Sequence, residues 1–211
     1  QVSATRPGGT STRTVSITAL QYQAPIVKGF EVTKLGTPGQ VRLHWKVSEG
    51  EAPNPVTLTF KAGATVLHTA TTLEGFADVD AGAATSFTLS AVNSTGTTES
   101  NKSLYAEGTF SAAVRAAGPV AWYRFNENAG TELFVDSADN AAPHNGKPTG
   151  TPVSGVEGVV DGAITLDANG GFVTNFILNP GQLDPGFTIE SVVRRDVALN
   201  NANRAIVSQS D

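Results

Sequence analysis

Alternation of apolar and polar residues with a period of two is the feature that most constrains this chain. Three stretches show it: 41–47, 56–61 and 87–91. Successive side chains of a β-strand point to opposite faces of a sheet, so each stretch predicts a strand with one buried face. In the first stretch Trp45 falls on the apolar face and is expected in the core. His44 falls on the opposite face and is expected in solvent.

Turn-forming sequences separate these strands and indicate the fold class. Gly, Pro or Asn occur at 36–39, 50–55, 61–63 and 93–96, and these residues favour chain reversals. Short strands separated by such turns, without helical periodicity, are typical of an antiparallel sandwich. The sequence therefore predicts an all-β sandwich at residues 24–109.

Three segments of this sandwich carry a family resemblance: 25–30, 41–45 and 85–96. They are similar to the immunoglobulin-like or fibronectin-type-III-like modules of bacterial surface and secreted proteins. The resemblance implies that Trp45 belongs to the core between two sheets. Residues 10–20 also alternate, but they precede the module. Residues 1–23 are therefore expected to end a preceding domain or to form a tether strand.

The second half of the chain changes character after Gly108. Residues 110–117 predict two helical turns, which Gly118 and Pro119 stop. Strands are expected after them at 120–125, 163–166, 171–173 and 187–193, and a polar loop is expected at 136–150. We expect this half to be all-β as well.

Seven motifs keep a fixed order in this half, at residues 119–125, 127–131, 136–140, 162–166, 172–173, 187–193 and 205–208. Their order resembles that of the laminin-G-like, concanavalin A-like jelly roll of large bacterial extracellular proteins. The resemblance implies that residues 110–211 are the N-terminal part of a jelly roll, completed by further strands of the polypeptide or by another chain. Eight apolar side chains are expected to need that cover: Trp122, Phe125, Ile164, Leu166, Phe172, Ile189, Val193 and Ile206.

Catalytic constellations do not occur in the sequence. Glycan hydrolysis needs two carboxyl groups about 5–9.5 Å apart. Glu190 has no acidic neighbour on its predicted strand, and Asp78 and Asp80 are predicted to lie in a turn. The chain has no Cys, and its 3 histidines share no metal-binding or triad spacing. We therefore predict that the chain is not an enzyme.

Calcium is the one cofactor for which the sequence offers ligands. Asp136, Asp139 and Asn140 place oxygen atoms in one loop, and Ca²⁺ binds six to eight oxygens. In the resembled family the corresponding loop often lies near a bound calcium, whereas the alternative reading is an ordinary turn rich in Asp and Asn. Further candidates are Asp167 and Asn169.

Trp122 and Tyr123 are candidates for stacking on a sugar ring. They lie next to each other in a predicted strand and so point to opposite faces. An exposed aromatic face with amides and carboxylates nearby is typical of sugar recognition. The alternative is that both rings are buried.

The charge and hydropathy of the chain limit its partners. The net charge is -5, and there is no basic stripe that could replace phosphate counterions, so nucleic acid is not expected. No apolar run approaches the roughly 18 residues of a membrane span. The absence of Cys fits a bacterial exported protein, and we expect an extracellular or cell-surface location.

These features predict a non-catalytic binding or adhesion segment of a larger secreted or surface bacterial protein, with a polysaccharide or cell-surface glycan as its partner. One alternative is a structural segment of a surface layer or filament, which self-associates or is completed by neighbouring strands. Another is an accessory region of a carbohydrate-active enzyme. A fold resemblance does not choose among them.

Overall fold

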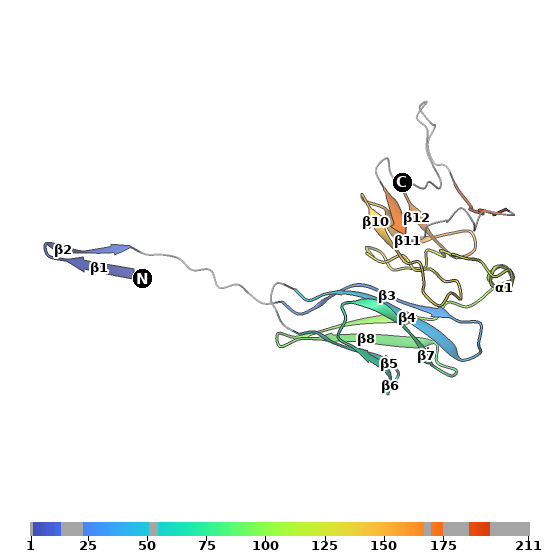
Figure 1. Cartoon of the computed structure of the whole chain (residues 1–211), viewed down its shortest axis with the longest axis horizontal. Coiled ribbons are helices and arrows are strands. Elements are labelled where there is room, and N and C mark those ends of the chain that lie inside the picture. The colour runs from blue at the N-terminus through green and yellow to red at the C-terminus, as the bar shows by residue number, and fades with distance from the viewer. Residues whose placement is uncertain (1, 14–22, 51–54, 167–169, 175–185, 195–211) are drawn as a thin grey trace, which may run out of the picture.

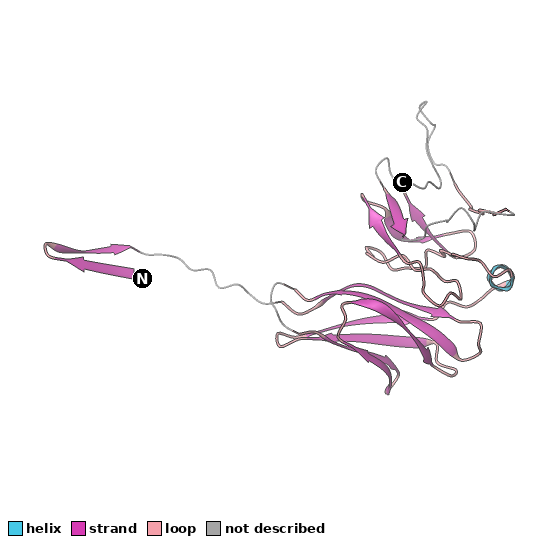
Figure 2. Ribbon diagram, viewed as in Figure 1, coloured by secondary structure: helices cyan, strands magenta, loops and turns pink. Residues whose placement is uncertain are grey.

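The computed structural model describes residues 2–13, 23–50, 55–166, 170–174 and 186–194. Antiparallel sheets dominate these residues, and one short helix, α1 (Thr109–Ala116), joins the two larger units (Figure 1, Figure 2). The all-β class is confirmed. The helix predicted at 110–117 is confirmed to within one residue.

Seven strands form a sandwich of two sheets, one with the order β3-β4-β7 and the other with the order β6-β5-β8-β9. The strands are β3 (Ile26–Lys34), β4 (Gln40–Ser48), β5 (Thr57–Ala62), β6 (Thr65–Ala70), β7 (Glu74–Asp80), β8 (Ser86–Val92) and β9 (Thr97–Ser103). The three alternating stretches of the sequence coincide with β4, β5 and β8, so these predicted strands are confirmed.

Apolar side chains from both sheets fill the space between them. Trp45 is 2% exposed, and its indole ring lies 4.8 Å from the ring of Phe60, measured between centroids. Its indole N–H donates to the carbonyl of Thr72 (2.8 Å). The predicted burial of Trp45 is confirmed. The buried core consists of Phe30, Val32, Val41, Leu43, Trp45, Val47, Val56, Leu58, Phe60, Phe87, Leu89 and Ala91.

The second unit consists of two small antiparallel sheets and long irregular loops. One sheet pairs β10 (Gly146–Thr149) with β13 (Gly171–Thr174), and the other pairs β11 (Val153–Glu157) with β12 (Gly162–Thr165). Four aromatic rings form a small core with centroids 5.0–6.4 Å apart: Tyr123, Phe125, Phe134 and Phe172.

Two of the strands predicted in this unit are confirmed and two are wrong. The stretches 163–166 and 171–173 coincide with β12 and β13. The stretch 120–125 is irregular and ends at Phe125, whose φ of 53° lies outside the β region. The stretch 187–193 is also not a strand, and no described strand pairs with it. The polar loop predicted at 136–150 gives way to β10 at its end.

A separate hairpin lies near the N-terminus. Its strands are β1 (Val2–Arg6) and β2 (Gly9–Arg13), which pair in antiparallel register. The alternating stretch 10–20 overlaps β2 at its beginning, and residues 14–22 lie outside the described residues.

Candidate functional site

A mostly irregular stretch of the second unit, residues 131–146, covers the outer face of β3 and β4 in the β3-β4-β7 sheet. We call it the covering segment, and we call its contact with the sheet the joint. Glu132 donates its backbone N–H to the carbonyl of Lys28 on β3 (2.8 Å). A Cβ atom added at Gly29 would lie 2.5 Å from Cβ of Leu133, so the close approach depends on Gly29 having no side chain. Figure 1 shows the second unit lying over β3 and β4.

The joint overturns one prediction from the alternation pattern. His44 is 0% exposed rather than solvent-facing, and Glu31 and Arg42 on the same face are 5% and 3% exposed. The physical reason is the covering segment, which removes this face from water. Around His44 both faces of β3 and β4 are therefore buried, one among apolar side chains and the other among polar ones, whereas Phe76 on the outer face of β7 is 40% exposed.

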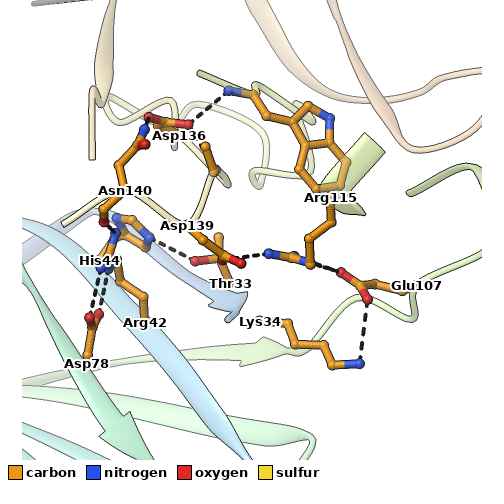
Figure 3. Close-up of polar contacts among 12 residues, drawn as sticks. Thr33, Lys34, Arg42, His44, Asp78, Glu107, Arg115, Asp136, Asp139 and Asn140 are labelled. Carbon is orange, nitrogen blue, oxygen red and sulfur yellow. Dashed lines mark hydrogen bonds and ion pairs between the residues drawn. The ribbon is translucent and has the colours of Figure 1, made fainter. Parts of the chain in front are cut away.

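Both ring nitrogens of His44 have hydrogen-bonding partners, of which Figure 3 labels Thr33. Nε2 lies 3.1 Å from Oγ1 of Thr33 on β3, and Nδ1 lies 3.1 Å from Nδ2 of Asn145 in the covering segment. Oδ1 of Asn145 accepts the backbone N–H of Asp136 (3.0 Å). Burial and the nearby Arg42 guanidinium lower the pKa of His44 to about 3. The ring is therefore neutral near pH 7.

Arg42 connects the sandwich to the covering segment (Figure 3). Its Nε and Nη2 atoms donate to the two carboxylate oxygens of Asp78 (2.5 and 2.8 Å), and its Nη1 donates to the carbonyl of Asn140 (2.6 Å). The hydrogen bonds from Arg42 lower the pKa of Asp78. The prediction that Asp78 and Asp80 lie in a turn is wrong, because both belong to β7 and pair across to β4.

A buried acidic pocket lies where β3 and β9 meet the second unit. Nζ of Lys102 lies 2.5 Å from Oε1 of Glu31 and donates to the carbonyl of Asn126 (2.7 Å). Glu127 accepts the N–H of Val135 on Oε1 (2.7 Å), whereas its buried Oε2 has no hydrogen-bond partner among the described residues. A cavity of about 20 Å³ adjoins these groups, which is room for one water molecule. Burial raises the pKa of Glu31 to about 8 and also raises that of Glu127.

A further cluster ties helix α1 to both units (Figure 3). Arg115 donates to Oε1 of Glu107 and to Oδ1 of Asp139, each over 2.7 Å. Nζ of Lys34 on β3 lies 3.5 Å from Oε2 of Glu107. Burial alone would raise the pKa of Glu107, but the hydrogen bond and charge of Arg115 lower it. Arg115 and its two carboxyl partners, with Lys34 beside Glu107, therefore hold the helix against the sandwich edge.

The three predicted calcium ligands lie in the covering segment, where Asp136 has an anchoring role. Its carboxylate is 0% exposed. It accepts the backbone N–H groups of Trp122, Ala138 and His144 at 2.9–3.0 Å, and the side-chain amide of Asn140 at 3.3 Å. Four N–H donors thus occupy the oxygens that calcium would need. This carboxylate takes the N–H of Trp122, and the stretch 120–125 keeps an isolated bridge between Tyr123 and Asp136 in place of a strand.

The other two predicted ligands are also engaged. Asp139 pairs with Arg115, and Asn140 donates its amide to the carbonyl of Val120 (2.5 Å). Among the described residues, no three His, Cys, Asp or Glu side chains gather to hold a metal ion. Calcium at this loop stays a prediction. The further candidates lie outside the described residues: Asp167 and Asn169.

A hollow of about 190 Å³ opens beside the indole ring of Trp122. Arg115, Asp139 and Asn140 contribute to its lining, so the hollow combines an aromatic ring with a guanidinium, a carboxylate and an amide. The guanidinium carbons of Arg115 and Arg124 lie 5.5 and 4.9 Å from the centroid of the indole. The ring is therefore held by cation–π contacts at the edge of the joint.

The other residues considered from the sequence lie apart from this hollow. Tyr123 belongs to the aromatic core, and its hydroxyl donates to the carbonyl of His144 (2.5 Å). His68 lies 5.8 Å from Trp45, between ring centroids, in the other sheet of the sandwich. Glu190 is exposed. The structure therefore brings together Trp122, Asp136, Asp139 and Asn140, whereas Tyr123, His68 and Glu190 lie apart from the hollow.

Sequence reasoning missed the joint, although one signal for it is present. Polar residues such as Glu31, Arg42 and His44 usually lie on a solvent-exposed face of a strand. Their pattern alone therefore does not indicate burial. Gly29 lies within β3, the strand that carries Glu31. The register of β3 with β4 shifts between Val27 and Gly29. A glycine at a β-bulge often marks the close approach of another backbone.

A comparison of the chain with protein-family models, with curated proteins and with solved structures found no match in any of the three. In the part of the chain that the structure describes, no helix has the length and apolar character needed to cross a membrane. Functional inferences for this chain therefore depend on the geometry of the joint and of the hollow.

Proposed function

We propose that this chain is a non-catalytic segment of a larger extracellular bacterial protein, in which an immunoglobulin-like sandwich presents a laminin-G-like unit to a polysaccharide or cell-surface glycan. The joint is the observation that carries this proposal. Contacts between domains of one chain usually leave them free to move. Here Arg42, His44 and Glu31 are buried and paired at the contact, so the sandwich holds the second unit in one orientation, as a presenting spacer must.

The strand arrangement supports the immunoglobulin-like part of the proposal. Seven antiparallel strands form two packed sheets, and a tryptophan of the second strand, Trp45 on β4, fills the space between them. Such sandwiches recur in many cell-surface proteins without detectable sequence similarity. An immunoglobulin-like spacer is thus consistent with a chain for which sequence comparison finds no relative.

We assign the sugar to the hollow beside Trp122. The indole offers an apolar ring beside Asp139, Asn140 and Arg115. A sugar hydroxyl would take the place of a partner that these polar groups now have within the chain. Small-molecule pockets usually measure about 300–1,000 Å³. At about 190 Å³, the hollow suits one sugar residue of a longer saccharide better than a whole oligosaccharide.

A glycan array probed with the intact chain tests this assignment. We expect binding that is lost in Trp122→Ala and weakened in Asp139→Asn. Phe110→Ala is the matched control, because Phe110 is an exposed aromatic residue (50%) that does not line the hollow. Absence of any bound glycan, or equal loss in the Phe110 variant, would contradict the proposal. Amide exchange of each variant shows whether the second unit remains folded.

The partners of the carboxyl groups support a non-catalytic role. Glu31, Asp78 and Asp161 are paired with a lysine or an arginine, and Asp136 is saturated by N–H donors. A retaining or inverting glycosidase needs one free acid and one free base facing its substrate. We expect no reducing sugar when the purified chain is incubated with β-glucan, chitin or xylan. Turnover that is lost in Glu190→Gln would instead make Glu190 a catalyst.

A role in assembly is a second candidate, and exposed apolar side chains of the second unit favour it. Among the described residues, those that are 48–85% exposed include Val120, Val153, Val159, Val160, Leu166, Val173, Phe187, Ile189, Val192 and Val193. Exposed apolar surface on this scale favours self-association or completion by neighbouring strands. Sedimentation velocity distinguishes the candidates, since assembly predicts oligomers that dissociate in Val192→Lys, and presentation alone predicts a monomer.

A further inference from the structure

The donors and acceptors around His44 determine its protonation state. Asn145 accepts the N–H of Asp136 with Oδ1, so the atom that it turns toward His44 is the amide Nδ2. An amide NH₂ group only donates hydrogen bonds. Nδ1 of His44 must therefore be an unprotonated acceptor, and the ring proton lies on Nε2, which donates it to Oγ1 of Thr33.

We propose that His44 makes the joint sensitive to acid, so that a proton added at Nδ1 releases the covering segment from the β3-β4-β7 sheet. The added N–H would face the two N–H bonds of Asn145, and an attraction between β4 and the covering segment would become a repulsion. The charged ring would also lack solvent, because His44 is 0% exposed. The sandwich core lies on the other face of the sheet and stays folded.

The charged groups of the sandwich around His44 act in both directions. Arg42 precedes it by two residues on the same face of β4 and opposes protonation, whereas Asp78 on β7 favours it. Glu31 on β3 is the cross-strand neighbour of His44, but its carboxyl group is engaged by Lys102. Burial and Arg42 outweigh Asp78, and this balance lowers the pKa of His44 to about 3.

The covering segment contributes two further titratable groups near Asn145. The carboxylate of Asp136 accepts N–H groups of its own segment, including that of His144. His144 directs its carbonyl to the hydroxyl of Tyr123. The group that faces Nδ1 of His44 is the neutral amide of Asn145. In the closed joint the imidazolium would therefore face a hydrogen-bond donor of the covering segment.

The sign of the pH effect follows from the two states of the joint. The closed joint keeps His44 neutral, whereas an exposed histidine takes up a proton below about pH 6.5. Opening therefore becomes more favourable as the pH falls through the window between about 6.5 and 3. Glu31 and Glu127 act in the opposite sense, because burial favours their protonated forms. Their effect cancels when two variants with the same carboxyl groups are compared at each pH.

Amide exchange in the intact chain measures the opening directly. The N–H of Glu132 is bonded across the joint to the carbonyl of Lys28, and the amides of β8 report the sandwich core. His44→Asn keeps an oxygen acceptor near the position of Nδ1 but cannot take up a proton. We expect the ratio of opening constants, wild type over His44→Asn, to rise about tenfold per pH unit below pH 6.5, or about 30-fold at pH 5. The β8 amides should stay protected.

Two more variants make the test decisive. His68→Asn, a histidine outside the joint, is the control and should match the wild type at every pH. Asn145→Asp places an acceptor opposite Nδ1 and should invert the effect, so that its joint tightens as the pH falls. A ratio that does not change with pH, or an Asn145→Asp joint that opens in acid like the wild type, would overturn the proposal. If His44→Asn does not fold, the inversion in Asn145→Asp decides alone.

Discussion

Different kinds of side chain stabilise the sandwich and the second unit. In the sandwich, apolar residues of two sheets fill one continuous core, and the backbone N–H groups pair within the sheets. In the second unit much of the backbone is irregular, and buried polar side chains satisfy it instead, as Asp136 does for three N–H groups. A sheet imposes a period on the sequence, whereas a polar anchor imposes none.

Removal of the largest core ring tests the first half of this comparison. We expect Trp45→Ala to destabilise the chain by about 3–5 kcal/mol, because it leaves a cavity and an unpaired carbonyl at Thr72. The edge of the indole also packs at Gly75, where an added Cβ would lie 2.8 Å from the ring. Urea denaturation followed by far-UV circular dichroism measures the loss. An unchanged unfolding midpoint would mean that the core does not depend on this ring.

Removal of the polar anchor tests the second half. We expect Asp136→Ala to destabilise the second unit by about 2–4 kcal/mol, because it leaves three N–H groups without their acceptor. Asp136→Asn is the matched control, since it keeps one acceptor oxygen and should lose less. Exchange should accelerate at the amides of Trp122, Ala138 and His144. Equal acceleration in β8 would show that the two units unfold together and that the comparison is wrong.

The sequence predicted the strands that carry an apolar face of their own. β4, β5 and β8 alternate clearly, and they form the centre of the sandwich. The strand β9 reads Thr-Thr-Glu-Ser-Asn-Lys-Ser and has no apolar face, and β7 carries three acidic residues. Both become strands because they pair with β8 and β4. Their structure depends on their neighbours, so a local pattern could not predict it.

The candidate site was predicted only in part, for a related reason. The sequence identified three functional residues in a polar loop: Asp136, Asp139 and Asn140. It predicted them as calcium ligands and not as partners of N–H groups and of Arg115. His44 was assigned to solvent because alternation tells which residues share a face and not what covers that face. The covering segment lies about 100 residues further along the chain, and nothing local connects the two. Gly29 was the one local sign of the contact.

The joint lies between the apolar packing of the sandwich and the polar packing of the second unit. At Gly29 the second unit approaches the sheet closely. We expect Gly29→Ala to weaken the joint by about 1–3 kcal/mol, because its Cβ would lie 2.5 Å from Cβ of Leu133 and backbone must move. Amide exchange at Glu132, whose N–H is bonded across the joint, should accelerate while β8 stays protected. Full protection at Glu132 would show that the covering segment can shift without leaving the sheet.

The acidic pocket gives the joint a second pH dependence, opposite in sign to that of His44. Burial raises the pKa of Glu31 to about 8, so the folded state favours the protonated carboxyl more than the unfolded state does. Stability from this group is complete below about pH 4.5 and is lost as the pH rises to about 8. We expect a loss of about 1 kcal/mol per pH unit in that window. Glu31→Gln should flatten the profile measured by urea denaturation, and an equally steep profile would exclude Glu31 as its source.

The smallest effect on stability is expected at a solvent-exposed ion pair of the joint, between Lys28 and Glu132. Nζ of Lys28 lies 2.8 Å from Oε1 of Glu132, but the two side chains are 34% and 42% exposed. Water screens such a pair, and ordering two long side chains costs entropy, so Lys28→Ala should change stability by less than about 1 kcal/mol. The backbone bond between the same two residues remains in this variant. A double-mutant cycle with Glu132→Ala isolates the pair, and a coupling above about 1 kcal/mol would show that charge, rather than the close backbone approach at Gly29, closes this end of the joint.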